Sequence, residues 1–240
     1  MLIDTHFHLD LIKNPEGLIK EINKQKIYTI AVTNLPQLFH NTVKLCEGYT
    51  YLRPALGYHP ELAHKYNDQI SLFKEIVHQT RYIGEVGLDN QKKSNVDFAD
   101  QKKIFESIID TCGSIGGKVL TIHSRKAEQQ VIDIIGNCFP GKVILHWYSG
   151  SLKELERALS YGFYFSINYK MTKSANGKKI IEQIPTERIL LETDGPFTMN
   201  NNETFTPIMT KLIKIEIDKI KAIPSSQDYL KLNFKKLLSI

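Results

Sequence analysis

Six side chains that can bind a divalent cation follow the ends of short apolar segments in the sequence. His6 and His8 stand two positions apart at the end of the first such segment. Residues two apart share one face of a strand, so both can reach a single ion. Such a pair alone is as often incidental as functional. It gains weight because four more ligand types recur in the same position: Glu85, His123, His146 and Asp194.

Each of these residues alone has a structural explanation, such as a core histidine, a paired acid, or an aspartate that caps the loop before Pro196. Together they share no structural need. Two carboxylates and four imidazoles around one low-dielectric opening would each cost several kcal/mol to desolvate without a cation. The residue types therefore predict a metal centre.

Six ligands exceed the three protein ligands and one water of a single catalytic zinc, which favours two ions bridged by a carboxylate. We expect Glu85 to be that bridge. One ion is then assigned to His6, His8 and Asp194, and the other to His123 and His146. A water held between the ions would lose its proton near neutral pH, and Asp194 could accept it. The mixed ligands suit Zn²⁺, Mn²⁺ or Mg²⁺ and do not select among them.

The elements that must position these ligands are short runs rich in Val, Ile, Leu and Tyr, each followed by a segment with helical spacing. The predicted strands are 2–4, 28–33, 52–57, 82–86, 119–122, 143–145, 163–167 and 189–192. The predicted helices are 15–25, 36–47, 68–79, 97–115, 126–137, 151–161, 173–183, 204–220 and 225–239. Helix starts are indicated by Asn14 before Pro15, by Ser151 with Glu154, and by Ser226.

Eight strand and helix units in 240 residues predict one domain over residues 1–240. The expected fold is an α/β, TIM-type (β/α)8 barrel rather than an open doubly wound sheet. GxGxxG after the first strand and a Walker loop are both absent from the sequence. In such a barrel, chemistry lies at the carboxyl ends of the strands, which is where all six ligand types fall.

The composition is that of a soluble globular protein, with 42% hydrophobic and 24% charged residues. No segment approaches the ~18 consecutive apolar residues of a membrane span, and the start does not resemble a signal peptide, so a cytoplasmic protein is expected. Cys46, Cys112 and Cys138 are widely spaced, which favours buried free thiols. The net charge of +5 arises in the second half, with 17 basic and 12 acidic residues; this weakly favours an anionic partner, although solvated helix faces explain it more simply.

Four residues beside the predicted ligands could contact substrate. Arg125 could hold a phosphate with its planar guanidinium or form a salt bridge at a helix start. His59 could donate to a phosphate oxygen or hold its own loop. Trp147 and Tyr148 are adjacent aromatics, of which we expect one to stack on a base and the other to pack beneath the loop.

The sequence resembles the TatD-family nucleases of the amidohydrolase superfamily. The segments DTHFHLD, ALGYHPEL, YIGEVGLD, IHSRKA, LHWYSGS and LLETDGPF occur in the order and spacing of that family, over most of the chain. The resemblance implies a barrel hydrolase with divalent cations that cuts phosphodiester bonds in DNA, often from a 3′ end. It also places the family's metal ligands at His6, His8, Glu85, His123, His146 and Asp194.

Within the family, LHWYSGS and ETDGPF resemble the QatD group, which implies a nuclease component of the Qat antiphage defence system with other Qat components as partners. One departure from the family is clear. Members usually carry an RGxxNEP-like stretch soon after the eighth-strand aspartate, whereas here Phe197 leads into TMNNNE. Because that loop would line the mouth, its loss leaves substrate length, strand preference and processivity open.

Two other functions stay open. The first is hydrolysis of a small phosphodiester or of another bond class on the same barrel. Relatives that act on another bond class commonly have a carbamylated lysine where Glu85 stands, or a glutamate where Lys126 stands. The presence of Glu85 and Lys126 in this chain therefore argues against hydrolysis of another bond class. The second is a non-catalytic nucleic-acid-binding or partner subunit, against which the complete set of ligand types argues.

Overall fold

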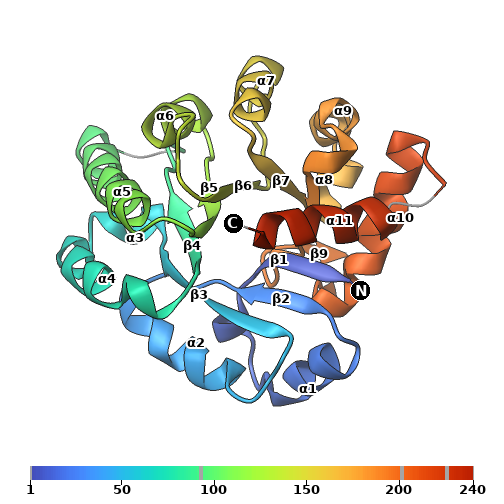
Figure 1. The fold of residues 1–240 in the computed structure, drawn as a ribbon, viewed down its shortest axis with the longest axis horizontal. Coiled ribbons are helices and arrows are strands. Elements are labelled where there is room, and N and C mark those ends of the chain that lie inside the picture. Colours follow the sequence, from blue (N-terminus) through green and yellow to red (C-terminus); the bar gives the residue numbers. More distant parts are fainter. Residues whose placement is uncertain (1, 92–93, 201–202, 225–226, 240) are drawn as a thin grey trace.

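Eight parallel strands arranged in chain order form the centre of the molecule (Figure 1). The computed structural model describes residues 2–91, 94–200, 203–224 and 227–239. The strands are β1 (Ile3–Phe7), β2 (Tyr28–Ala31), β3 (Leu52–Tyr58), β4 (Tyr82–Gly87), β5 (Val119–His123), β6 (Lys142–His146), β7 (Tyr164–Ile167) and β8 (Ile189–Leu191). Helices surround them on the outside, so the predicted (β/α)8 barrel is confirmed.

Every predicted helical range contains a helix, and the structure adds some short elements. The helices are α1 (Glu16–Lys24), α2 (Phe39–Cys46), α3 (Pro60–Ala63), α4 (Ile70–Ile76), α5 (Asn95–Ile115), α6 (Glu128–Ile135), α7 (Leu152–Ser160), α8 (Tyr169–Lys173), α9 (Ala175–Gln183), α10 (Thr210–Lys221) and α11 (Gln227–Leu238). After β8 comes a small antiparallel hairpin of β9 (Met199–Asn200) and β10 (Glu203–Thr204). The sequence analysis missed α3, α8 and this hairpin.

The seam between β8 and β1 is joined by buried polar contacts. The Asp4 carboxylate accepts hydrogen bonds from the backbone N–H groups of His6 (3.1 Å) and Thr193 (3.0 Å), and it also binds the Thr193 hydroxyl. Burial raises the pKa of Asp4 to about 8, against the lowering effect of these bonds. The N–H of Asp194 donates to the carbonyl of His6 at 2.9 Å. This seam holds the ends of the first and last strands together.

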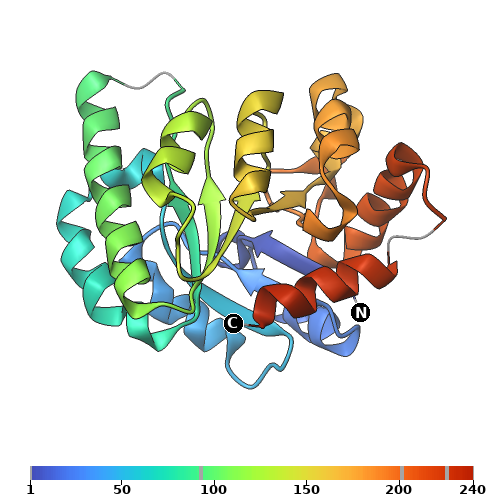
Figure 2. The same ribbon diagram turned by 45° about the horizontal axis from the view of Figure 1, so that its top comes forward.

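Helix α11 crosses the amino-terminal end of the barrel, as the red helix in Figures 1 and 2 shows. Its Phe234 and Leu237 are buried against the first residues of the strands, among them Ile3, Ile30 and Ile144. Each such side chain contributes roughly 1.5–3 kcal/mol by leaving water. That end is therefore closed by apolar packing, and the opposite end is left for polar chemistry.

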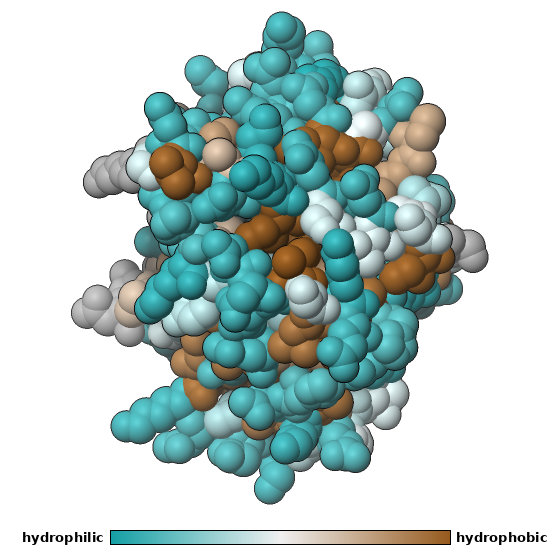
Figure 3. All heavy atoms as spheres, turned by 90° about the vertical axis from the view of Figure 1, so that its left-hand side faces the viewer, coloured by the Kyte–Doolittle hydropathy of each residue, from teal (hydrophilic) through white to brown (hydrophobic). Residues whose placement is uncertain are grey.

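The outer surface on the side of α4 and α5 is mostly hydrophilic, and hydrophobic residues are visible in the hollows between the protruding hydrophilic side chains (Figure 3). Among the described helices, none combines the length and the apolar character needed to cross a bilayer. The three cysteines are free, and Cys46 and Cys112 are buried as predicted, but the prediction of a buried thiol is wrong for Cys138, which is exposed.

The predicted helix starts are only partly correct. Ser151 accepts a hydrogen bond from the N–H of Glu154 at 3.2 Å and caps α7 as predicted. Asn14 does not cap α1, because the first helical bond runs from Ile19 N–H to the carbonyl of Pro15, which makes Pro15 the capping residue. Ser226 lies outside the described residues.

Candidate metal centre

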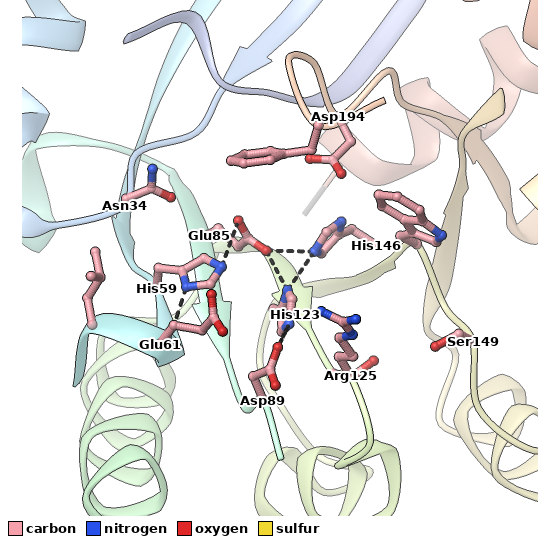
Figure 4. Close-up of a pocket in the computed structure, with 14 residues that line it drawn as sticks. Asn34, His59, Glu61, Glu85, Asp89, His123, Arg125, His146, Ser149 and Asp194 are labelled. Carbon is pink, nitrogen blue, oxygen red and sulfur yellow. Dashed lines mark hydrogen bonds and ion pairs between the residues drawn. The ribbon is translucent and has the colours of Figure 1, made fainter. Parts of the chain in front are cut away.

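The carboxyl ends of the strands gather the six predicted ligands in one place, and Figure 4 shows four of them, Glu85, His123, His146 and Asp194. One oxygen of Glu85, Oε1, lies 2.7 Å from His123 Nδ1 and 2.8 Å from His146 Nε2. The other, Oε2, lies 3.5 Å from His6 Nε2 and 3.3 Å from His8 Nε2. Among the described residues, Glu85 is therefore the carboxylate that reaches both groups of histidines, as the bridging role requires.

A cation-sized gap lies among His6, His8, Glu85 and Asp194. Asp194 Oδ1 lies 3.7 Å from His6 Nε2 and 3.5 Å from His8 Nε2. Among the described residues, neither Nε2 atom has a hydrogen-bond partner, although both are buried. Ligands about 2.0–2.2 Å from a tetrahedral ion stand roughly 3.3–3.6 Å from one another. The donor atoms thus have the spacing of a metal coordination shell, and the two orphaned nitrogens face its centre.

The second group is tighter. His123 Nδ1 and His146 Nε2 lie 3.3 Å apart, and both are within hydrogen-bond distance of Glu85. An ion here would replace these bonds. Three sets of ligand atoms lie within 4.8 Å of one another: those of His6, Glu85 and His146, those of His6, His8 and Asp194, and those of His59, Glu85 and His123. The residues present therefore fit a divalent-metal centre, with the number of ions and the division of ligands among them kept as predictions.

Glycines let β4 approach β5 closely enough to place Glu85 there. A Cβ on Gly84 would lie 2.0 Å from the side chain of Thr121. Gly87 has a φ of +144°, and a Cβ there would lie 2.0 Å from the carbonyl oxygen of His123. Larger residues would push the strand that carries Glu85 away from its partners.

Electrostatics in the site favour positive charge between the carboxylates. Burial lowers the pKa of His8, but its contacts with Asp194 and Glu85 outweigh burial and raise it to about 9. Burial raises the pKa of Glu85, but the surrounding imidazoles, His59 and His146 foremost, outweigh burial and hold it well below its usual value. The carboxylates thus attract the positive charge that a divalent cation would supply.

Three residues that the sequence analysis did not assign lie at the outer nitrogens of the imidazoles, and two of them hydrogen-bond there. Thr121 Oγ1 lies 2.7 Å from His6 Nδ1, and Asp89 Oδ2 lies 2.9 Å from His123 Nε2. Such partners fix the ring and the tautomer of a metal ligand. The third is the fully buried Glu192, whose Oε1 lies 3.7 Å from His146 Nδ1. Asp89 and Glu192 fall within the quoted segments YIGEVGLD and LLETDGPF, which was the available signal.

His59 combines the two roles that the sequence left open. Its Nδ1 accepts the N–H of Glu61 at 3.2 Å and caps α3, and its Nε2 lies 3.6 Å from Glu85 Oε2. Burial lowers its pKa to about 4, so the ring is neutral at neutral pH. Since Nδ1 is an acceptor, Nε2 carries the proton. In this tautomer His59 is a hydrogen-bond donor aimed at the centre, and its ring also belongs to the group with Glu85 and His123 whose ligand atoms could hold an ion.

A pocket of about 640 Å³ opens over the centre, and Arg125 and Trp147 line it together with His59 (Figure 4). Tyr148 does not line it. Its side chain is only 1% exposed, and its hydroxyl donates to the carbonyl of Ser151 at 2.8 Å. The assignment of Tyr148 to substrate is corrected on this ground. Trp147 has a φ of 39°, and the chain turns there, so the two adjacent rings part as expected.

A (β/α)8 barrel with imidazoles and carboxylates gathered at the carboxyl ends of its strands defines a metal-dependent hydrolase. Residues 3–238 match the family model of TatD related DNase. The chain belongs to this family, which confirms the prediction, made from the sequence, of a metal-dependent hydrolase of the nuclease type.

Individual relatives are similar over most of the chain. It is 28% identical over 209 residues to the uncharacterized metal-dependent hydrolase YabD of Bacillus subtilis, covering 82% of this chain and 81% of that protein. It is 31% identical over 152 residues to the 3′-5′ ssDNA/RNA exonuclease TatD of Edwardsiella piscicida, covering 60% and 57%. The crystal structure of YJJV, the TatD homologue of Escherichia coli K12, superposes with a TM-score of 0.86 at 21% identity, covering 100% and 98%.

Proposed function

We propose that the protein is a 3′–5′ exodeoxyribonuclease that uses two divalent ions held by the six predicted ligands. The observation that carries this proposal is the bridging position of Glu85, with His6 and His8 on one oxygen and His123 and His146 on the other. Membership of a DNase family and a relative named as a 3′–5′ exonuclease support the substrate and the direction.

When bound, the ions activate a water molecule and polarise the phosphodiester. The residues of the chain do the rest. Asp194 accepts the proton of the attacking water, since its carboxylate is buried beside the first group of ligands. His59 donates a hydrogen bond from its Nε2–H to a phosphate oxygen, and the guanidinium of Arg125 holds a neighbouring phosphate. Trp147 stacks on a base of the strand.

The finer biological assignment is also a proposal. We infer that the protein acts as the nuclease component of the Qat antiphage system, with other Qat components as partners. The support for this inference is the resemblance of the LHWYSGS and ETDGPF segments to the QatD group. The free, buried thiols of Cys46 and Cys112 suit the reducing cytoplasm. We take residues 1–240 as one domain.

One assay tests the nuclease proposal. Purified protein is incubated with 3′- and 5′-labelled single- and double-stranded oligonucleotides under Mg²⁺, Mn²⁺, Zn²⁺ or EDTA. We expect metal-dependent shortening from the 3′ end that Glu85→Ala and His146→Ala both abolish. Shortening that survives both substitutions would remove the site assignment. Hydrolysis of bis(p-nitrophenyl) phosphate without oligonucleotide cleavage would favour the alternative of a small phosphodiester substrate.

A further inference from the structure

Phe197 is an aromatic side chain at the pocket that the proposed mechanism does not use. It lines the pocket and yet leaves 57% of its surface exposed. Two residues later, Met199 is 43% exposed. A phenyl ring commonly buries about 150–250 Å² of surface in a fold, and this burial is how it stabilises the protein. A ring that stays exposed beside a polar centre contributes little to stability.

The position of Phe197 is fixed by its backbone. Its N–H donates to the carbonyl of Asp194 at 2.9 Å, and the next residue, Thr198, bonds through its hydroxyl to Thr193. The carbonyl of Thr198 accepts a hydrogen bond of 3.0 Å from the N–H of Phe205, the residue after β10, which links the turn to the end of the hairpin. Gly195 lets this return segment pack closely, since a Cβ there would lie 2.0 Å from the Phe205 carbonyl oxygen. The ring is thus carried by a braced turn.

The ring also stands next to the metal centre. It meets the imidazole of His8 edge to face, with ring centroids 5.0 Å apart and an interplanar angle of 88°. His8 is a predicted ligand, and Asp194 lies three residues before Phe197. A nucleotide whose phosphate is bound at the centre must therefore place a neighbouring base near this ring.

We propose that Phe197 is the stacking platform for the nucleobase next to the scissile phosphate. This inference rests on the proposed nuclease function and names a binding site within it. The ligand class is a nucleobase of a single-stranded end, held through its π face without hydrogen bonds, so binding tolerates any base. Trp147 is partly buried against the core, whereas Phe197 offers more of its surface to the solvent.

A nucleobase suits this surface better than a protein partner. Among the described residues of this turn, the exposed large apolar side chains are Phe197 and Met199. A stable protein interface buries at least about 1,000 Å² in total, far more than two side chains provide. One base, in contrast, needs one aromatic face, and a preorganised ring binds it at low entropic cost.

The test changes the Phe197 ring in the protein and, separately, the 3′-terminal base in the DNA, so that the contribution of their contact to binding can be measured. Binding to the metal-loaded protein is measured by fluorescence anisotropy with 5′-labelled single strands whose 3′-terminal phosphorothioate linkage slows cleavage. One strand carries a normal 3′-terminal base, and the other carries a stable tetrahydrofuran spacer without a base. The variants are Phe197→Ala, Phe197→Leu and Phe197→Trp, and the matched control is Ile215→Ala, an apolar residue 46% exposed on α10.

We expect Phe197→Ala to weaken binding of the normal strand by about 5-fold or more, the lower limit that stacking energies of 1–3 kcal/mol per base give. Phe197→Leu should weaken it nearly as much, Phe197→Trp should restore it, and Ile215→Ala should change nothing. For the spacer strand, the wild type should bind as weakly as Phe197→Ala. Equal loss with both strands, or no loss with either, would overturn the platform. A wild type that binds neither strand would overturn the nuclease proposal and this one with it.

Discussion

At the residue scale, the candidate centre depends on side chains that do not contact the proposed ions. Glu192 is the clearest case, because it joins the ends of three strands. Its Oε1 accepts the backbone N–H of Trp147 at 3.1 Å and the side-chain amide of Asn168 at 2.9 Å, and its Oε2 accepts the Ser166 hydroxyl. The same carboxylate faces the unpartnered Nδ1 of His146 across 3.7 Å. It can therefore hold both His146 and Trp147 in place.

Glu192→Gln should weaken one metal site and spare the other. The amide replaces an acceptor oxygen with an N–H donor, so a buried donor of Ser166 or Asn168 loses its partner and the negative charge near His146 is lost. We expect about 10- to 100-fold weaker binding of the ion that His146 holds, measured by calorimetric titration of metal-free protein with Mn²⁺ or Zn²⁺. Glu156→Gln, on the exposed face of α7, is the control. Equal weakening of both sites would contradict this role.

The gathering of the candidate ligands at the strand ends could be predicted from the sequence, whereas a support such as Thr121 could not. His6, Glu85 and His146 each follow a strand pattern, and a parallel barrel brings all strand ends to one mouth. The role of Thr121 depends on a contact across the barrel interior, from β5 to His6 on β1, which no local pattern encodes. Likewise, the turn at Trp147 places that side chain at the pocket and buries Tyr148, and no sequence pattern showed which of the two would be buried.

At the element scale, the one-turn helix α3 connects the fold to the chemistry. Its capping residue, His59, uses one ring nitrogen to start the helix and the other to face Glu85. The capping task requires the neutral ring, because Nδ1 must accept, and burial keeps the ring neutral by lowering its pKa to about 4. The helix therefore orients a hydrogen-bond donor whose charge state is set by packing.

The pKa of His59 predicts a pH dependence of stability. Between about pH 6.5 and 4 the unfolded chain binds a proton at this residue and the folded chain does not, so stability falls as the pH falls. His59→Asn keeps a capping oxygen but cannot titrate. From pH 7 to 5, the wild type should lose about 1–2 kcal/mol more unfolding free energy than the variant, measured by urea denaturation in EDTA. Parallel losses would show that His59 is charged in the fold.

The elements that the sequence missed share a physical cause. Helices α3 and α8 have four and five residues, too short to show a helical repeat. The first strand extends to Phe7, beyond the predicted end at Asp4, because Asp4 and His6 are buried polar residues whose partners lie on the neighbouring seam. Long elements with apolar faces, such as α5, were predicted because their period repeats several times.

At the scale of the whole molecule, the two ends of the barrel differ in what holds them. The amino-terminal end is filled by apolar side chains beneath α11, including Phe234. The carboxyl end holds buried carboxylates and imidazoles that crowd together, with orphaned nitrogens on His6 and His8. Such a cluster costs free energy unless a cation compensates it. The stability of the molecule should therefore depend on metal at one end only.

Metal removal should lower the melting temperature of the protein markedly. At free metal 100 times the Kd, binding to the folded state alone stabilises it by about 2.7 kcal/mol for one site. In a chain of this size, each kcal/mol moves Tm by roughly 2–4 °C, so adding Zn²⁺ or Mn²⁺ to EDTA-treated protein should raise Tm by about 5–10 °C. Differential scanning calorimetry measures the shift. Glu85→Ala, which removes the bridge, should melt at the same temperature with and without metal, and a full shift in that variant would mean that the ions bind elsewhere.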